Sequence, residues 1–106
     1  MTPESLWEVS VHDGVIVVQN PQGEIETLPI ANVISVKIET DDSGPWESDV
    51  WWLISSNDDA LVFPSGATGE KTVLEALQLL PGFDNDAVTR AMSCTEPRTF
   101  VCFTRL

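Results

Sequence analysis

The stretch DVWWLISSNDDALVFPSGATGE, residues 49–70, decides the fold. Residues 50–54 and 61–63 are apolar and flank a polar turn, which is typical of a β-hairpin. Pro64 has no N–H to donate, so we expect the pairing to end there. Two glycines and Glu70 then lead into a segment with helical spacing of its apolar residues. The stretch therefore predicts a hairpin, a glycine-bearing loop and the start of a helix.

The first strand of this hairpin is apolar on both faces. Val50, Trp52 and Ile54 share one face, and Trp51 and Leu53 share the other, because side chains alternate along a strand. Such a strand is expected to be covered on two sides or to lie inside a barrel. We expect Trp52 in the core and Trp51 partly buried under a helix.

Short strands precede the hairpin. Alternating polar and apolar residues at 7–12, the turn Asp13-Gly14 and the apolar run 15–19 predict a hairpin with a type I′ turn. A weaker strand is expected at 24–28, and a well-patterned one at 33–40. Because short turns join these strands, the sheet is expected to be mainly antiparallel.

Two helices and a last strand are expected after the hairpin. Thr68 is the expected cap of a helix over 69–80, with Glu70 in its first turn, where negative charge is favoured. Asp84 is the expected cap of a shorter second helix. The strand 99–105 follows, with Phe100 and Cys102 alternating against Val101 and Phe103.

The chain is predicted to be a single α+β domain over residues 1–106. The fold expected is a bent antiparallel sheet of six to seven strands, PH-like or a half-barrel, with two helices inserted before the last strand. A chain of 106 residues with 42% hydrophobic content is long enough for one core.

The charge is strongly acidic, with 17 acidic and 5 basic residues and a net charge of −12. Residues 1–66 contain 12 acidic residues and only Lys37, a net −11. Such a surface repels phosphate backbones and anionic lipid, which argues against nucleic-acid and membrane partners and favours a basic protein partner. The alternative is that acidity only keeps a small protein soluble.

The cysteines and the hydropathy indicate a cytoplasmic protein. No apolar run approaches the roughly 20 residues of a membrane span, and the N-terminal residues do not have a signal-peptide pattern. Cys94 and Cys102 form no C-x-x-C pair, so we expect two buried free thiols in a reducing compartment.

Residues 66–72, GATGEKT, resemble a phosphate-binding loop between a strand and a helix. Such a loop needs glycine immediately before its lysine, whereas Glu70 stands at that position and would present a carboxylate to the anion. A glycine turn with a helix cap is the preferred interpretation, and no cofactor is expected.

Catalytic residues are not expected. His12 is the sole histidine and lies at a hairpin turn, with no serine or cysteine placed beside it by the pattern. The rival hypothesis places a metal or a carboxylate-based hydrolytic site at the 41–49 loop, because carboxylates bind hard cations such as Ca²⁺. That loop lacks the spacing of an EF-hand, so no metal ligands are assigned.

The leading hypothesis is a non-enzymatic cytoplasmic protein-binding domain with an acidic, tryptophan-bearing surface, because tryptophan commonly anchors protein interfaces. The candidate partner-binding residues are Asp41, Asp42, Trp46, Glu47 and Asp49. One form of the hypothesis is an immunity or inhibitor protein that blocks a basic toxin by charge complementarity. A third possibility is a structural homodimer joined through strand edges, so both monomer and homodimer stay open.

Several motifs resemble those of a family of small bacterial proteins of uncharacterised activity. They are Asp42-Ser43-Gly44-Pro45-Trp46, Asp49-Val50-Trp51-Trp52, Phe63-Pro64, Gly66-Ala67-Thr68-Gly69-Glu70 and Leu80-Pro81-Gly82-Phe83-Asp84-Asn85. The resemblance covers most of the chain from Val33 onward and implies no activity. The strands leading to Leu28-Pro29-Ile30-Ala31-Asn32-Val33 resemble the start of a PH-like sheet, a family with seven strands and one capping helix. Two helices before the last strand leave a sheet with helices on one face as the alternative.

Overall fold

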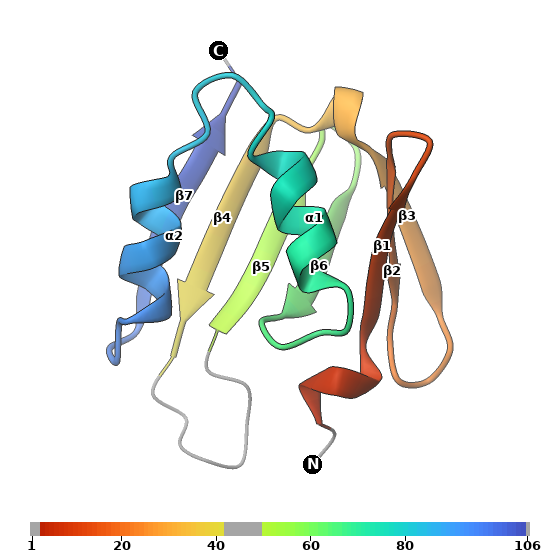
Figure 1. Ribbon diagram of the computed structural model, residues 1–106, viewed down its shortest axis with the longest axis horizontal. Helices are drawn as coiled ribbons and strands as arrows, with labels where there is room; N and C mark the ends of the chain where they lie inside the picture. The colour runs from red at the N-terminus through yellow and green to blue at the C-terminus, as the bar shows by residue number, and fades with distance from the viewer. Residues whose placement is uncertain (1–2, 42–49, 106) are drawn as a thin grey trace.

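The computed structural model describes residues 3–41 and 50–105, and its elements follow the order that the sequence predicts (Figure 1). Within these residues there are seven strands and two helices, and both helices precede the last strand. The strands are β1 (Glu8–His12), β2 (Val15–Gln19), β3 (Ile25–Pro29), β4 (Ser35–Thr40), β5 (Val50–Ser55), β6 (Ala60–Pro64) and β7 (Arg98–Thr104), and the helices are α1 (Glu70–Leu77) and α2 (Asn85–Met92). The α+β class is therefore confirmed.

The strands form two antiparallel sheets, with the orders β1-β2-β3 and β6-β5-β4-β7. One continuous sheet is therefore not confirmed for the residues that the structure describes. Pro29 ends β3, and a 3₁₀ turn at Ile30–Asn32 leads the chain into β4 in the middle of the second sheet. This break separates β3 from the strands that follow it.

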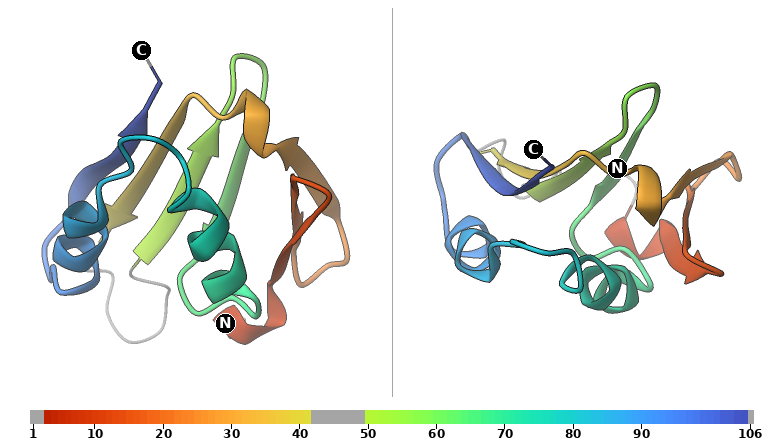
Figure 2. Two further views of the ribbon diagram at one scale, coloured as in Figure 1. Left: turned by 45° about the horizontal axis from the view of Figure 1, so that its top comes forward. Right: turned by 90° about the horizontal axis from the view of Figure 1, so that it is seen from above.

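Both helices lie on one side of the four-stranded sheet, and the three-stranded sheet turns toward that same side (Figure 2). α1 packs beside β1, and α2 packs over β7 and β4. The four-stranded sheet and the three-stranded sheet therefore flank α1 on two sides, while α2 covers β7.

Trp52 is the largest side chain of the core. Its ring stacks on Phe63 with a centroid distance of 6.1 Å and an interplanar angle of 14°. Trp51 points to the opposite face, is partly buried as expected, and meets Trp7 edge-to-face at 5.8 Å. The contact found for its ring is with Trp7, in the segment before β1, whereas Glu70 of α1 contacts the Trp52 indole. Other fully buried side chains from both sheets and α1 are Ile16, Leu28, Val33, Val36, Ile38, Ile54, Leu61, Val73 and Leu77.

Two local predictions are confirmed. Asp13 and Gly14 have φ of 51° and 75°, as a type I′ turn requires, and His12 pairs with Val15 across it. The carboxylate of Asp84 accepts a hydrogen bond from the N–H of Ala87 at 3.0 Å and caps α2.

The cap of α1 is Gly69, so the prediction of Thr68 is wrong. Thr68 is held by β1 instead: its N–H donates to the Trp7 carbonyl, and its own carbonyl accepts from the N–H of Val9, both at 2.8 Å. Gly69 has φ of 92°, and a Cβ at this position would overlap the carbonyl oxygen of Val9. Only glycine fits here, because both the conformation and the close approach exclude a side chain.

A bulge in β7 changes the expected alternation of its side chains. Lys37 pairs with Val101 and Val36 with Phe103, which leaves Cys102 as the extra residue. Cys102 and Phe103 are therefore both buried, although Phe103 was expected on the opposite face. Burial, assisted by the nearby Asp84 carboxylate, raises the pKa of the Cys102 thiol from 9.0 to about 11. Cys94 is only partly buried, so the expectation of two buried thiols holds for Cys102 alone.

Candidate functional site

The predicted site falls on the connection between β4 and β5. Asp42, Trp46, Glu47 and Asp49 lie outside the residues that the structure describes, whereas Asp41 is described and exposed. Residues 40 and 50 are paired in register across the two strands, so the connection leaves and re-enters the sheet at neighbouring positions. The arrangement of its acidic residues and of Trp46 stays a prediction.

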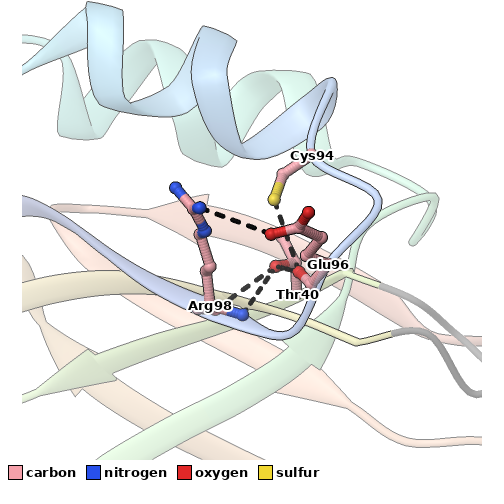
Figure 3. A network of polar contacts seen from close by, with 4 residues as sticks. All are labelled: Thr40, Cys94, Glu96 and Arg98. Carbon is pink, nitrogen blue, oxygen red and sulfur yellow. Dashed lines mark hydrogen bonds and ion pairs between the residues drawn. The ribbon is translucent and has the colours of Figure 1, made fainter.

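The start of this connection is anchored by the buried hydroxyl of Thr40 (Figure 3). The hydroxyl donates to the Glu96 carbonyl at 2.6 Å and accepts from the N–H of Arg98 at 3.1 Å. The Arg98 guanidinium forms an ion pair with the Glu96 carboxylate at 3.3 Å, and the Cys94 thiol donates to the Glu96 carbonyl. The end of β4 is therefore fixed to the segment that precedes β7.

The glycine loop before α1 is filled by the Glu70 carboxylate. That carboxylate accepts hydrogen bonds from the Trp52 indole at 2.7 Å, the Ser65 hydroxyl at 2.8 Å and the N–H of Gly66 at 3.0 Å. These three donors are thus engaged within the chain, and the Glu70 carboxylate occupies the position that an anion would take. Glu70 lies in the first turn of α1 as predicted, but its contact with Trp52 was not predicted, because no local pattern reveals it.

The metal hypothesis gains no support from the part of the chain that the structure describes. Over residues 3–41 and 50–105, no group of three or more His, Cys, Asp or Glu side chains is positioned to hold a metal ion. His12 is exposed at the end of β1. The proposed metal loop itself lies almost wholly outside these residues, so that rival stays a prediction.

A surface groove lies between β3 and β6, where the edges of the two sheets face each other. It has two adjoining openings of about 320 and 390 Å³ that share Glu26 and Ala60. The walls combine apolar and acidic side chains, namely Trp7, Val18, Val62, Glu24, Glu26 and Asp59. The sequence gives no signal for this groove, because it depends on which strands become neighbours.

The backbone of both edge strands faces the groove. Hydrogen bonds from the Asn20 N–H to the Glu24 carbonyl and from the Ser56 N–H to the Asp59 carbonyl fix where each ladder begins. Because antiparallel ladder bonds alternate, the peptide groups of Ile25 and Thr27 on β3, and of Ala60 and Val62 on β6, are directed away from their paired strands. These groups add hydrogen-bond donors and acceptors to the walls.

The groove carries a net negative charge. Neither opening has a lysine or arginine among the described residues that line it. The two ion pairs found between described residues, Arg90 with Asp84 and Arg98 with Glu96, lie in the second half of the chain. The Glu24 carboxylate accepts a hydrogen bond from the Asn20 amide at 2.9 Å, which orients it without neutralising it. A cation is therefore the complementary ligand.

A second hollow lies at the end of the four-stranded sheet near the C-terminus. It measures about 330 Å³ and is mostly polar, with Asn32, Ser56 and Arg105 in its wall. Nε of Arg105 donates to the Val33 carbonyl at 2.9 Å, and the guanidinium lies 5.7 Å from the centroid of the Phe103 ring. These contacts give Arg105 a role in joining β7 to the start of β4.

Comparison with known proteins gives no relative from which a function could be inferred. No protein-family model, curated protein or solved structure matches this chain. Among the described residues, no helix is long and apolar enough to cross a membrane.

Proposed function

We propose that this protein is a non-enzymatic binding domain that meets a basic protein partner through its acidic sheet side. The observation that carries the proposal is the groove between β3 and β6, whose walls hold Glu24, Glu26 and Asp59 and no described cation. Carboxylates without cationic neighbours attract a positively charged surface and accelerate its association. The segment between β4 and β5 in sequence adds further acidic residues, Asp41, Asp42, Glu47 and Asp49.

An immunity or inhibitor protein for a basic toxin is the specific form of this proposal. An inhibitor must associate quickly and tightly, and opposite net charges serve both needs. The net −11 of residues 1–66 supports this form. The proposed location is the cytoplasm, consistent with two free cysteines. The PH-like resemblance of the first strands stays a prediction, and the proposal does not depend on it.

The homodimer is the less favoured alternative, because three strand edges in the described part lack the space that the edge strand of a second folded copy would need, although the groove between β3 and β6 is open to a single extended segment. β3 and β6 face each other, and Thr68 bridges to β1. The edge of β7 carries the bulge at Cys102, a feature that opposes edge-to-edge pairing. Sizing of the protein tests this alternative directly, since a stable dimer elutes at twice the monomer mass.

The proposed function is tested by salt dependence. The full chain is immobilised, a partner is captured from an extract of the native cell, and the purified partner is titrated at increasing NaCl. We expect a basic partner whose Kd rises about tenfold or more between roughly 50 and 500 mM salt. An acidic partner, or an affinity indifferent to ionic strength, would contradict the proposal.

The metal rival is tested by thermal unfolding with Ca²⁺, Mg²⁺ or Zn²⁺. A ligand that binds only the folded state raises the Tm with its concentration. An unchanged Tm with all three cations removes the support for a metal or metal-dependent hydrolytic site at 41–49.

A further inference from the structure

We infer that the groove between β3 and β6 receives an arginine side chain carried on an extended segment of the partner protein. This inference rests on the proposed function and specifies its contact site. The opening of about 320 Å³ beside Trp7 is within the size range of ligand pockets and combines the two chemistries that an arginine side chain requires.

The apolar part of the opening suits the arginine stem. Trp7, Val18 and Val62 line it, and together they offer an aromatic and aliphatic surface for three methylene groups. The Trp7 ring meets the Trp51 ring edge-to-face at 86°, which restrains its orientation. An indole held in this way also attracts a guanidinium over its face.

The acidic part of the opening suits the guanidinium. Glu26 lies directly opposite Val18 in the β2–β3 register, so its side chain is on the core-facing side of β3, at the groove. Glu24 lies at the start of the same strand, and Asn20 orients its carboxylate. Two carboxylates beside an apolar wall favour arginine over lysine, because the planar guanidinium can bind both while it stacks on the ring.

The groove walls also favour an extended backbone on either side of that arginine. The outward peptide groups of Ile25 and Val62 are unused by their own ladders. Extended peptides bind such edges through main-chain hydrogen bonds, while side chains enter pockets. A phosphate-bearing ligand is disfavoured by the carboxylates, and a wholly apolar segment would leave them buried without a partner.

The test uses capped pentapeptides with the sequence Gly-Val-Arg-Val-Gly, titrated into the isotopically labelled full chain and followed by NMR. We expect the largest shifts at the Trp7 indole and at the amides of Ile25 and Val62. Replacing the arginine with citrulline, its neutral isostere, should abolish the shifts. Shifts confined to other parts of the protein, or equal binding of the citrulline peptide, would overturn the inference.

Matched variants distinguish binding of the arginine in the groove from attraction by the net charge of the protein. Glu26→Gln should weaken the arginine peptide about fivefold, the effect expected for loss of one partly exposed charge contact. The control is Glu75→Gln on the exposed side of α1, which removes the same charge elsewhere and should change the Kd by less than about twofold. Equal weakening by both variants means attraction by net charge alone and contradicts the inference.

The captured partner distinguishes this inference from the proposed function. If Glu26→Gln leaves the partner's Kd unchanged while that Kd still rises with salt, the acidic binding domain stands and the groove is not its contact site. If the Kd is indifferent to salt, the proposed function fails, whatever the peptide shows.

Discussion

Two glutamates, Glu70 beside the glycine loop and Glu26 in the groove, differ in whether their carboxylates are hydrogen-bonded within the chain. Glu70 is partly buried and accepts three hydrogen bonds from Trp52, Ser65 and Gly66, all within the chain. Glu26 is exposed in the groove beside β6, and no side-chain hydrogen bond or ion pair found between described residues involves its carboxylate. In the glycine loop, the carboxylate of Glu70 is thus already bound by donors of the same chain. At the edge of β3, the carboxylate of Glu26 is exposed to a ligand.

The largest loss of stability is expected at Gly69, where the loop packs against β1. Gly69→Ala adds a Cβ that overlaps the Val9 carbonyl at a φ of 92°, so we expect a loss of about 3 kcal/mol or more in the free energy of unfolding, measured with urea. Gly82→Ala is the control, because Gly82 also has positive φ but has open space around it. We expect it to lose about 1 kcal/mol. Equal losses would show that only backbone conformation matters at Gly69.

Glu70→Ala removes the acceptor that fills the glycine loop. The Trp52 indole N–H then has no partner in a fully buried side chain, and we expect a loss of about 2 kcal/mol in the free energy of unfolding. Glu75→Ala, one turn further along α1, should cost less than about 0.5 kcal/mol. A double-mutant cycle with Trp52→Phe measures the coupling, and additive losses would argue against this hydrogen bond as a source of stability.

Cys102 is a titratable group buried in the core, so stability should depend on the pH through its thiol. Its folded pKa of about 11 lies above the usual value of 9.0, so its contribution to stability is present below pH 9 and is lost as the pH rises toward 11. From pH 8 to 10 the free energy of unfolding of the parent protein should fall by about 1 kcal/mol more than that of the Cys102→Ala variant. The Cys102→Ala variant corrects for other groups that titrate, and parallel curves for the two proteins would contradict the assignment.

The smallest stability effect is expected in the groove. Glu26→Gln removes an exposed carboxylate from a chain of net charge −12, so the free energy of unfolding should stay within about 0.5 kcal/mol of the parent or rise slightly. Glu70→Gln should lower the free energy of unfolding more, because it weakens three internal hydrogen bonds. A large loss in Glu26→Gln would show that this residue stabilises the fold and is not kept for a ligand.

Local patterns predicted the elements well because each depends on near neighbours in sequence. The Asp13-Gly14 turn, the Asp84 cap and the alternation in β4 are examples. The cap at Gly69, the bulge at Cys102 and the division into two sheets were missed. Each depends on a contact between distant segments, such as Thr68 with β1 or the 3₁₀ turn after Pro29 with the second sheet.

The candidate site was predicted less well than the fold. Acidic residues are so frequent that Glu24, Glu26 and Asp59 carry no distinctive signal until β3 and β6 become neighbours. The alternation of polar and apolar residues at 7–12 does not reveal that Trp7 lines a groove. The acidic residues at 41 and 42 could be predicted as a site because they are adjacent in sequence. The residues of the groove are adjacent only in the folded chain.

The attachment of Thr68 to the start of the chain has a consequence for folding kinetics. The Thr68 hydroxyl bonds the Ser5 carbonyl across a separation of 63 residues, and the backbone bridge to β1 spans nearly as many. The hairpins β1–β2 and β5–β6 need only short loops to form, whereas this bridge must close a loop of more than half the chain. We therefore expect α1 to dock onto β1 late in folding. Substitutions that weaken the contact between Thr68 and β1 should then accelerate unfolding more than they slow folding.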